Sequence, residues 1–148
     1  MIDEKELVSA AIRARKNAYA PYSRFRVGAA LLTAAGEVFT GCNIENASYP
    51  AGICAERTAL VKAVSEGKRD FLAIAVAGSP EEFDQDGNLS DKLTGPAYPC
   101  GICRQMLREF ADSESFLVYV ADAEGVIHRH TLGELLPESF GPENLRKC

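Results

Sequence analysis

The chain has 148 residues, of which 47% are hydrophobic and 25% are charged, and its formal net charge is −5. This composition is typical of a globular protein with one core, so we expect a single domain over residues 1–148. The acidic balance disfavours nucleic acid as a partner, because binding phosphates requires clustered Lys and Arg. We expect no membrane contact and a cytoplasmic location, because apolar runs are short and the N-terminal residues lack a signal-peptide pattern.

The first half of the chain predicts one helix, a pair of strands and a loop. Apolar side chains recur at helical spacing over residues 4–19, which indicates an amphipathic helix. Residues 26–33 and 37–41 are two strands joined by a short Gly-containing turn, and therefore form a hairpin. Residues 43–52 show no clear period and contain Pro and Gly, so we expect a loop there.

Two further helices and a strand follow this loop. Residues 54–66 are typical of a helix, and 71–77 form a continuous apolar run that favours a strand buried on both faces. Residues 79–98 are rich in Asp, Gly, Pro and Ser, which predicts a long surface loop or insertion. A third helix is expected over 100–111.

The last two predicted strands, over residues 116–121 and 126–131, are separated by four residues. Because a parallel crossover needs a dozen or more residues, a direct pairing of these strands must be antiparallel. The order of all elements predicts an α/β fold with a central mixed five-stranded sheet and helices on both faces.

Five cysteines are present, and three of them lie at predicted helix starts. The odd number argues against a disulfide framework. Cys100 and Cys103 lie one helical turn apart, so their sulfurs face the same way, and Cys54 opens the preceding helix. Helix N-termini favour thiolates. Three thiolates with one open position are typical of a catalytic Zn²⁺ site, near which Glu56 is placed to move protons.

Other interpretations of these residues stay open at this point. Cys42 ends a predicted strand and is a conceivable fourth ligand, which would make the zinc site structural. In a second interpretation, the cysteines are buried apolar thiols without a metal. In a third, Cys100 and Cys103 form a redox-active pair. His128 and His130 share one face of the last strand and are a possible metal pair, although we expect them to face solvent.

Six ordered blocks of sequence extend beyond the cysteines and cover nearly the whole chain. They lie at 19–23 (YAPYS), 27–31 (VGAAL), 41–49 (GCNIENASY), 54–59 (CAERTA), 99–105 (PCGICRQ), and 135–137 with 140–142 (LLP, FGP). Together they resemble the small zinc-dependent cytidine deaminases. The resemblance implies a cytidine-deaminase-like three-layer sandwich. One departure from compact relatives is the stretch 81–97, which looks longer than usual.

The resemblance also implies a role for individual residues. It makes Cys54, Cys100 and Cys103 the zinc ligands and Glu56 the proton shuttle, with Arg57 donating hydrogen bonds to the thiolates. Arginine there makes physical sense, because a guanidinium offsets part of the negative charge of three thiolates. Further residues match the family's substrate site, namely Asn43 and Glu45 for the ribose, Phe25 near the pyrimidine, Ala55 near the amino group, and Tyr49 and Phe140.

The implied activity is hydrolytic deamination of cytidine and deoxycytidine, with a role in pyrimidine salvage. An enzyme for a related aminopyrimidine or a nucleoside antibiotic is one alternative, and a structural-zinc module without turnover is another. A nucleic-acid deaminase is disfavoured by the acidic charge and by cysteine at position 54. The resembled family is typically a homotetramer in which Tyr49 and Phe140 match positions that reach into neighbouring sites.

Overall fold

The computed structural model describes residues 1–146, and Cys148, which we expected to be a loose thiol, lies outside this part. One mixed sheet has the strand order β2-β1-β3-β4-β5. Its third and fourth strands are parallel, and its last two are antiparallel, as predicted. The strands are β1 (Phe25–Thr33), β2 (Val38–Cys42), β3 (Phe71–Pro80), β4 (Leu117–Ala121) and β5 (Ile127–Thr131).

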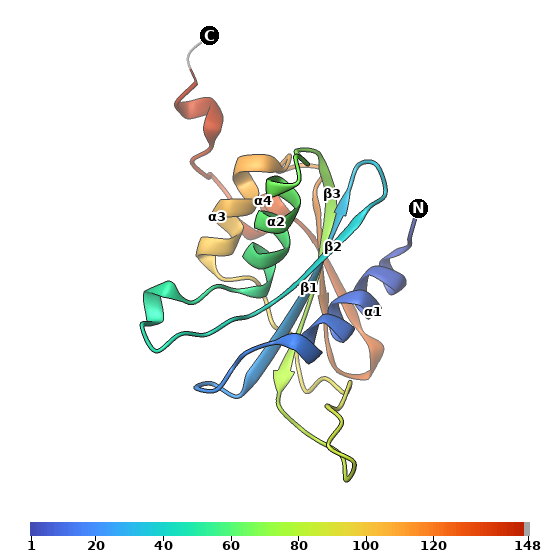
Figure 1. The fold of residues 1–148 in the computed structure, drawn as a ribbon. Coiled ribbons are helices and arrows are strands. Elements are labelled where there is room, and N and C mark those ends of the chain that lie inside the picture. Colours follow the sequence, from blue (N-terminus) through green and yellow to red (C-terminus); the bar gives the residue numbers. More distant parts are fainter. Residues whose placement is uncertain (147–148) are drawn as a thin grey trace.

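Helices cover both faces of this sheet, so the predicted three-layer α/β sandwich is confirmed (Figure 1). Helix α1 (Glu4–Ala14) packs on one face and starts at Asp3, whose carboxylate accepts a hydrogen bond from the Glu6 N–H at 2.9 Å. Such a capping box satisfies backbone donors that the first helical turn leaves free. The other helices are α2 (Ala55–Ser65), α3 (Gly101–Phe110) and the short α4 (Leu132–Leu135).

The sheet has a hydrophobic core on each side. Side chains of β1 alternate between them, with Ala29 and Leu31 facing α2 and α3, and Ala30 and Leu32 facing α1. This alternation follows from the two-residue period of a strand. Strand β3 is central and buried on both faces, as its continuous apolar run predicts.

Two elements differ in length from their predictions by three residues or more. The first helix ends at Ala14 and continues only as a 3₁₀ turn to Asn17, because the Tyr19 N–H instead donates to the Asn43 carbonyl at 3.0 Å. Strand β3 extends beyond residue 77 to Pro80, since it pairs with the whole of β1 up to Phe25. No helix within residues 1–146 is long and apolar enough to cross a membrane.

A close approach between β2 and α2 fixes where the second helix begins. A Cβ atom on Gly41 would lie 2.5 Å from both the Ala55 carbonyl oxygen and the Ala59 nitrogen. Only glycine allows a strand backbone to approach a helix backbone this closely. The sheet therefore determines the position of the first turn of α2, which carries the predicted site residues Ala55, Glu56 and Arg57.

Candidate metal centre and adjoining pocket

Three thiols meet between the starts of α2 and α3. The sulfurs of Cys54, Cys100 and Cys103 all lie within 4.8 Å of one another. The Sγ atoms of Cys54 and Cys100 are 3.9 Å apart, and those of Cys100 and Cys103 are 3.5 Å apart. Cys42 is not part of this cluster among the described residues, so the structure does not support it as a fourth ligand.

The two helix starts leave these thiols free to bind something else. Cys54 and Cys100 each occupy the position just before a helix, with an extended backbone, and neither side chain makes a capping hydrogen bond. Thiolates are stabilised at such positions by the helix dipole and the free N–H groups. Cys103 lies in the first turn of α3 and is fully buried.

Glu56 lies in the first turn of α2, and its side chain is almost completely buried, with 3% of its surface exposed. Its Oε1 atom has no hydrogen-bond partner within the described residues. Burial raises the pKa of Glu56 to about 7, because a charged carboxylate is poorly solvated there. Since a buried polar atom normally has a partner, this oxygen points to a group that the protein is built to receive.

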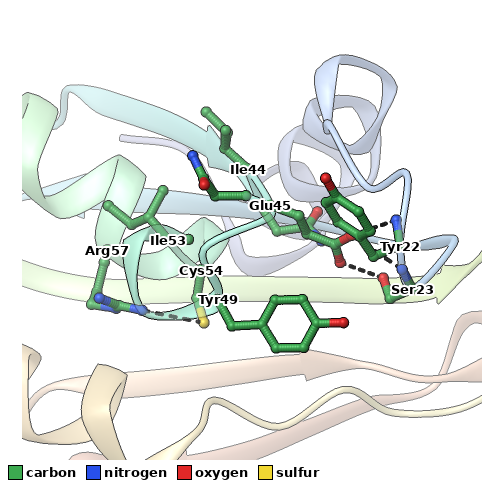
Figure 2. Close-up of a pocket in the computed structure, with 11 residues that line it drawn as sticks. Tyr22, Ser23, Ile44, Glu45, Tyr49, Ile53, Cys54 and Arg57 are labelled. Carbon is green, nitrogen blue, oxygen red and sulfur yellow. Dashed lines mark hydrogen bonds between the residues drawn. The ribbon is translucent and has the colours of Figure 1, made fainter.

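Arg57 provides the positive charge next to the cluster. Its Nη2 donates a hydrogen bond to the Cys54 sulfur (Figure 2), and the two atoms are 3.7 Å apart. Hydrogen bonds from Cys103, Arg57 and Cys100 lower the pKa of Cys54 to about 5. The pKa of Cys103 is raised, first by its hydrogen bond to Cys54 and then by burial. The set of thiols therefore already favours one thiolate.

A pocket of about 450 Å³ adjoins the cluster at Cys54 and Arg57. Its size lies within the roughly 300–1,000 Å³ that is usual for small-molecule sites. Most of its wall comes from the loop before α2 and from the turn before β1 (Figure 2). Predicted substrate residues Asn43, Glu45 and Tyr49 line it, so the structure brings these three together with the metal cluster.

The carboxylate of Glu45 is held by the turn that precedes β1. Its Oε1 accepts hydrogen bonds from the backbone N–H groups of Tyr22 at 3.0 Å and Ser23 at 3.1 Å, and its Oε2 accepts one from the Ser23 hydroxyl. These bonds lower its pKa below the ordinary value, although burial acts in the opposite direction. Glu45 is therefore a fixed, ionised group on the pocket wall.

Asn43 joins the pocket to the start of β1. Its side-chain carbonyl accepts from the Val27 N–H at 2.9 Å, and its side-chain NH₂ donates to the Phe25 carbonyl at 2.9 Å. An amide has two donors and two lone pairs, so one of each is still available to a ligand. Phe25 itself is half-buried and is not among the residues that line the pocket.

Tyr49 and Phe140, the two aromatic residues that match positions reaching into neighbouring sites, occupy different positions. Tyr49 lines the pocket and is 76% exposed, with its ring 6.2 Å from that of Tyr22. Phe140 is 58% exposed, lies outside the pocket lining, and is joined to α3 through its carbonyl, which accepts from Gln105 at 2.9 Å. Ala55 is fully buried at the start of α2. Within one chain, Phe140 is thus not brought to the pocket.

Sequence reasoning missed three residues that support the site. Tyr22 and Ser23 were noticed only as part of a matching block, although Pro21 before them is a turn signal. Arg104 was given no role, yet it donates to the Pro99 carbonyl at 2.7 Å and to the Leu135 carbonyl at 2.7 Å. It thereby fixes the loop that presents Cys100.

Comparisons with known proteins agree with this geometry. Residues 1–119 match the family model described as the cytidine and deoxycytidylate deaminase zinc-binding region. A cytidine deaminase of Halalkalibacterium halodurans is 46% identical over 144 residues, which cover 97% of this chain and 98% of that protein. A blasticidin-S deaminase of Bacillus cereus is 30% identical over 118 residues, covering 80% and 79% of the two chains.

Among solved structures, a cytidine deaminase from Burkholderia pseudomallei has a TM-score of 0.80 at 43% identity, covering 94% of this chain and 100% of that one. The fold and the family model together define a zinc-binding deaminase. The chain belongs to the cytidine deaminase family.

The residues fit the Zn²⁺ ion that this family model implies. Three thiols converge, a buried Glu56 oxygen beside them has no hydrogen-bond partner among residues 1–146, and the Arg57 guanidinium offsets excess negative charge. Sulfur ligands suit zinc, and a site with three protein ligands keeps one position open for chemistry.

We therefore expect the purified protein to hold about one zinc per chain, as a single three-thiolate site implies. Cys54→Ala, Cys100→Ala and Cys103→Ala should each lose most of the metal, because two thiolates bind zinc far more weakly than three. Cys42→Ala is the matched control and should keep it. Elemental analysis measures the content, and zinc retained by the Cys54 variant, or lost by the Cys42 variant, contradicts the three-ligand assignment.

Proposed function

We propose that this protein hydrolyses cytidine and deoxycytidine to uridine and deoxyuridine, with Glu56 moving the protons, Cys54, Cys100 and Cys103 holding the zinc, and Arg57 balancing its charge. The observation that carries the proposal is the buried, unpartnered Glu56 oxygen beside three convergent thiols. A structural zinc site would not need a buried carboxyl group beside the thiols with an oxygen that has no partner among residues 1–146.

Zinc, when bound, supplies a Lewis acid that makes water acidic enough to react near neutral pH. Glu56 would accept a proton from the attacking water as the water oxygen adds to the ring carbon that carries the amino group, and would pass this proton to the adjacent ring nitrogen. It would then take the proton of the new hydroxyl group and deliver it to the amino group, so that the C–N bond breaks, ammonia leaves and the carbonyl group forms. One residue acts as base and then as acid, so its carboxyl group must reach both the water and the ring.

The substrate is a free nucleoside in this proposal. Glu45 and Asn43 on the pocket wall offer an ionised acceptor and a spare amide donor for sugar hydroxyls, and Ala55 lies at the helix start beside the thiols. A fixed carboxylate near the sugar would repel the phosphate of a nucleotide. The 30% identity to a blasticidin-S deaminase is the basis for a second candidate, a cytosine-containing nucleoside antibiotic, but the 46% identity to a cytidine deaminase favours cytidine.

Loss of the cytidine absorbance band, with release of ammonia, tests this proposal directly. Glu56→Gln should keep its zinc and fold but lose at least about 10³-fold in rate, because it cannot accept the proton. Glu66→Gln, on the exposed C-terminal end of the same helix, is the matched control and should retain full activity. A Glu56→Gln enzyme with a tenth of the parent rate contradicts the shuttle role, and comparable turnover of cytidine monophosphate contradicts the nucleoside assignment.

The active unit is a homotetramer in this proposal, and the whole chain is one deaminase domain around one sheet. Tyr49 and Phe140 are both well exposed, although large aromatic side chains gain most when they are buried at interfaces. The pocket opens along the loop that carries Tyr49, so a neighbouring chain would help to exclude water there. The same proposal includes three further points. Phe25 lies near the pyrimidine, and the enzyme serves pyrimidine salvage. The protein is cytoplasmic, where reducing conditions keep thiols free.

Light scattering at micromolar concentration should give about 64 kDa, which is four chains of 16.0 kDa. Phe140→Ala should weaken both assembly and activity. It should leave the zinc content unchanged, because Phe140 is part neither of the thiol cluster nor of the pocket wall of its own chain. Leu72→Ala, at another exposed apolar residue outside the pocket lining, is the control for general loss of apolar surface. A fully active monomer rules out completion of the site by a neighbour.

A further inference from the structure

Glu81, the first residue of the 81–97 stretch, is bound to the start of β1. Its side chain is only 10% exposed and lies between two arginines, with Oε1 at 2.8 Å from Arg26 Nε and Oε2 at 3.5 Å from Arg24 Nη1. Its backbone N–H donates to the Arg24 carbonyl at 2.8 Å. Three contacts thus join Glu81, which follows the end of β3, to Arg24 and Arg26 at the start of β1. The chemistry proposed above uses none of these contacts.

Arg26 makes this attachment firm. Its Nη1 donates to the Lys16 carbonyl at 2.9 Å, and its guanidinium lies 5.7 Å from the centre of the Phe83 ring. Its side chain is 17% exposed, so its ion pair with Glu81 is only weakly screened by solvent and salt. Glu81 is therefore anchored through Arg26, and its backbone N–H presents a fixed donor to Arg24.

Arg24 needs such a donor because its backbone is unusual. Its φ angle is +57°, in the left-handed region that residues other than glycine rarely adopt. A conformation of this kind persists only when the surrounding structure holds it. The Arg24 N–H donates to the Ala20 carbonyl at 3.0 Å and its carbonyl accepts from Glu81, so both of its peptide groups are fixed.

The left-handed residue directly follows the turn that holds Glu45. Ser23, immediately before Arg24, donates to the Glu45 carboxylate from both its N–H and its hydroxyl. The same hydroxyl accepts from the Phe25 N–H, immediately after Arg24, at 3.0 Å. A change in the backbone at Arg24 therefore alters the direction of both Ser23 donors.

We propose that Glu81 is a positioning residue that fixes Arg24 in its left-handed conformation, and thereby holds the Glu45 carboxylate at the place where it meets the sugar hydroxyls. The inference rests on the proposed function for its substrate. It assigns to the 81–97 stretch a role in selecting nucleosides with hydroxylated sugars, although Glu81 itself does not line the pocket. The residue acts through Arg24 and Ser23 and touches no reacting atom.

Steady-state kinetics of Glu81→Ala against cytidine and 2′,3′-dideoxycytidine test this inference. Loss of a group that positions a ground-state contact raises KM more than it lowers kcat. We expect the KM for cytidine to rise about fivefold with kcat within about twofold, while kcat/KM for the dideoxy substrate stays within about twofold. Glu82→Ala, which removes the exposed neighbouring carboxylate, should behave as the parent enzyme. Equal losses for both substrates, or no loss for either, overturn the inference.

Hydrogen exchange supplies a reading that does not depend on turnover. The Ser23 amide donates to Glu45, so it should exchange at least about threefold faster in Glu81→Ala and unchanged in Glu82→Ala. Unchanged protection of this amide in Glu81→Ala contradicts the link from Glu81 to Glu45. A parent enzyme that leaves cytidine intact defeats the proposed function instead, and the exchange result then still decides whether Glu81 holds the turn.

Discussion

The convergence of three thiols within 4.8 Å is the constraint on which the rest of the structure depends. Thiolates so close repel one another, and a bound cation is what makes their approach favourable. Two helix starts supply them, and each start is fixed from outside: Gly41 lets β2 approach α2, and Arg104 holds the loop before α3. Cys54 and Cys100 lie 46 positions apart in the chain, and the mixed sheet brings their two helix starts together.

The two carboxyl groups of the site, Glu56 and Glu45, lie in different environments. Glu56 is buried beside the thiols, and its pKa is raised to about 7 by the loss of solvation. Glu45 lies at the wall of an open pocket, where the Tyr22–Ser23 turn holds it ionised. In the proposed mechanism, the chemistry needs a carboxyl group that exchanges protons readily, whereas sugar recognition needs one that stays ionised. Burial and hydrogen bonding adjust the same functional group in opposite directions.

Local patterns predicted the fold well, because strand and helix periods determine which faces become buried. The Gly-containing turn identified the β1–β2 hairpin, the continuous apolar run identified β3, and the short last connection correctly required an antiparallel pair. Each half of the thiol cluster was also predictable, since Cys54 lies within one helical turn of Glu56 and Arg57, and Cys100 within one turn of Cys103. That the two halves meet was implied by the family resemblance. The turn that holds Glu45 was not, because its bonds join residues 22 or 23 positions apart. Arg15 was equally hidden, since its burial depends on carbonyls at Arg26, Ser79 and Ser90.

Stepwise reconstitution of the metal-free protein is the most direct test of the link between the thiol cluster and catalysis. Zinc should be removed with a chelator under reducing conditions and returned in sub-stoichiometric steps, with cytidine turnover measured at each step. Activity should rise in proportion to added zinc and reach its plateau at about one equivalent per chain, because one site of three thiolates binds one ion. Full turnover by the metal-free protein, or a plateau only at about two equivalents, would contradict a single catalytic ion at Cys54, Cys100 and Cys103.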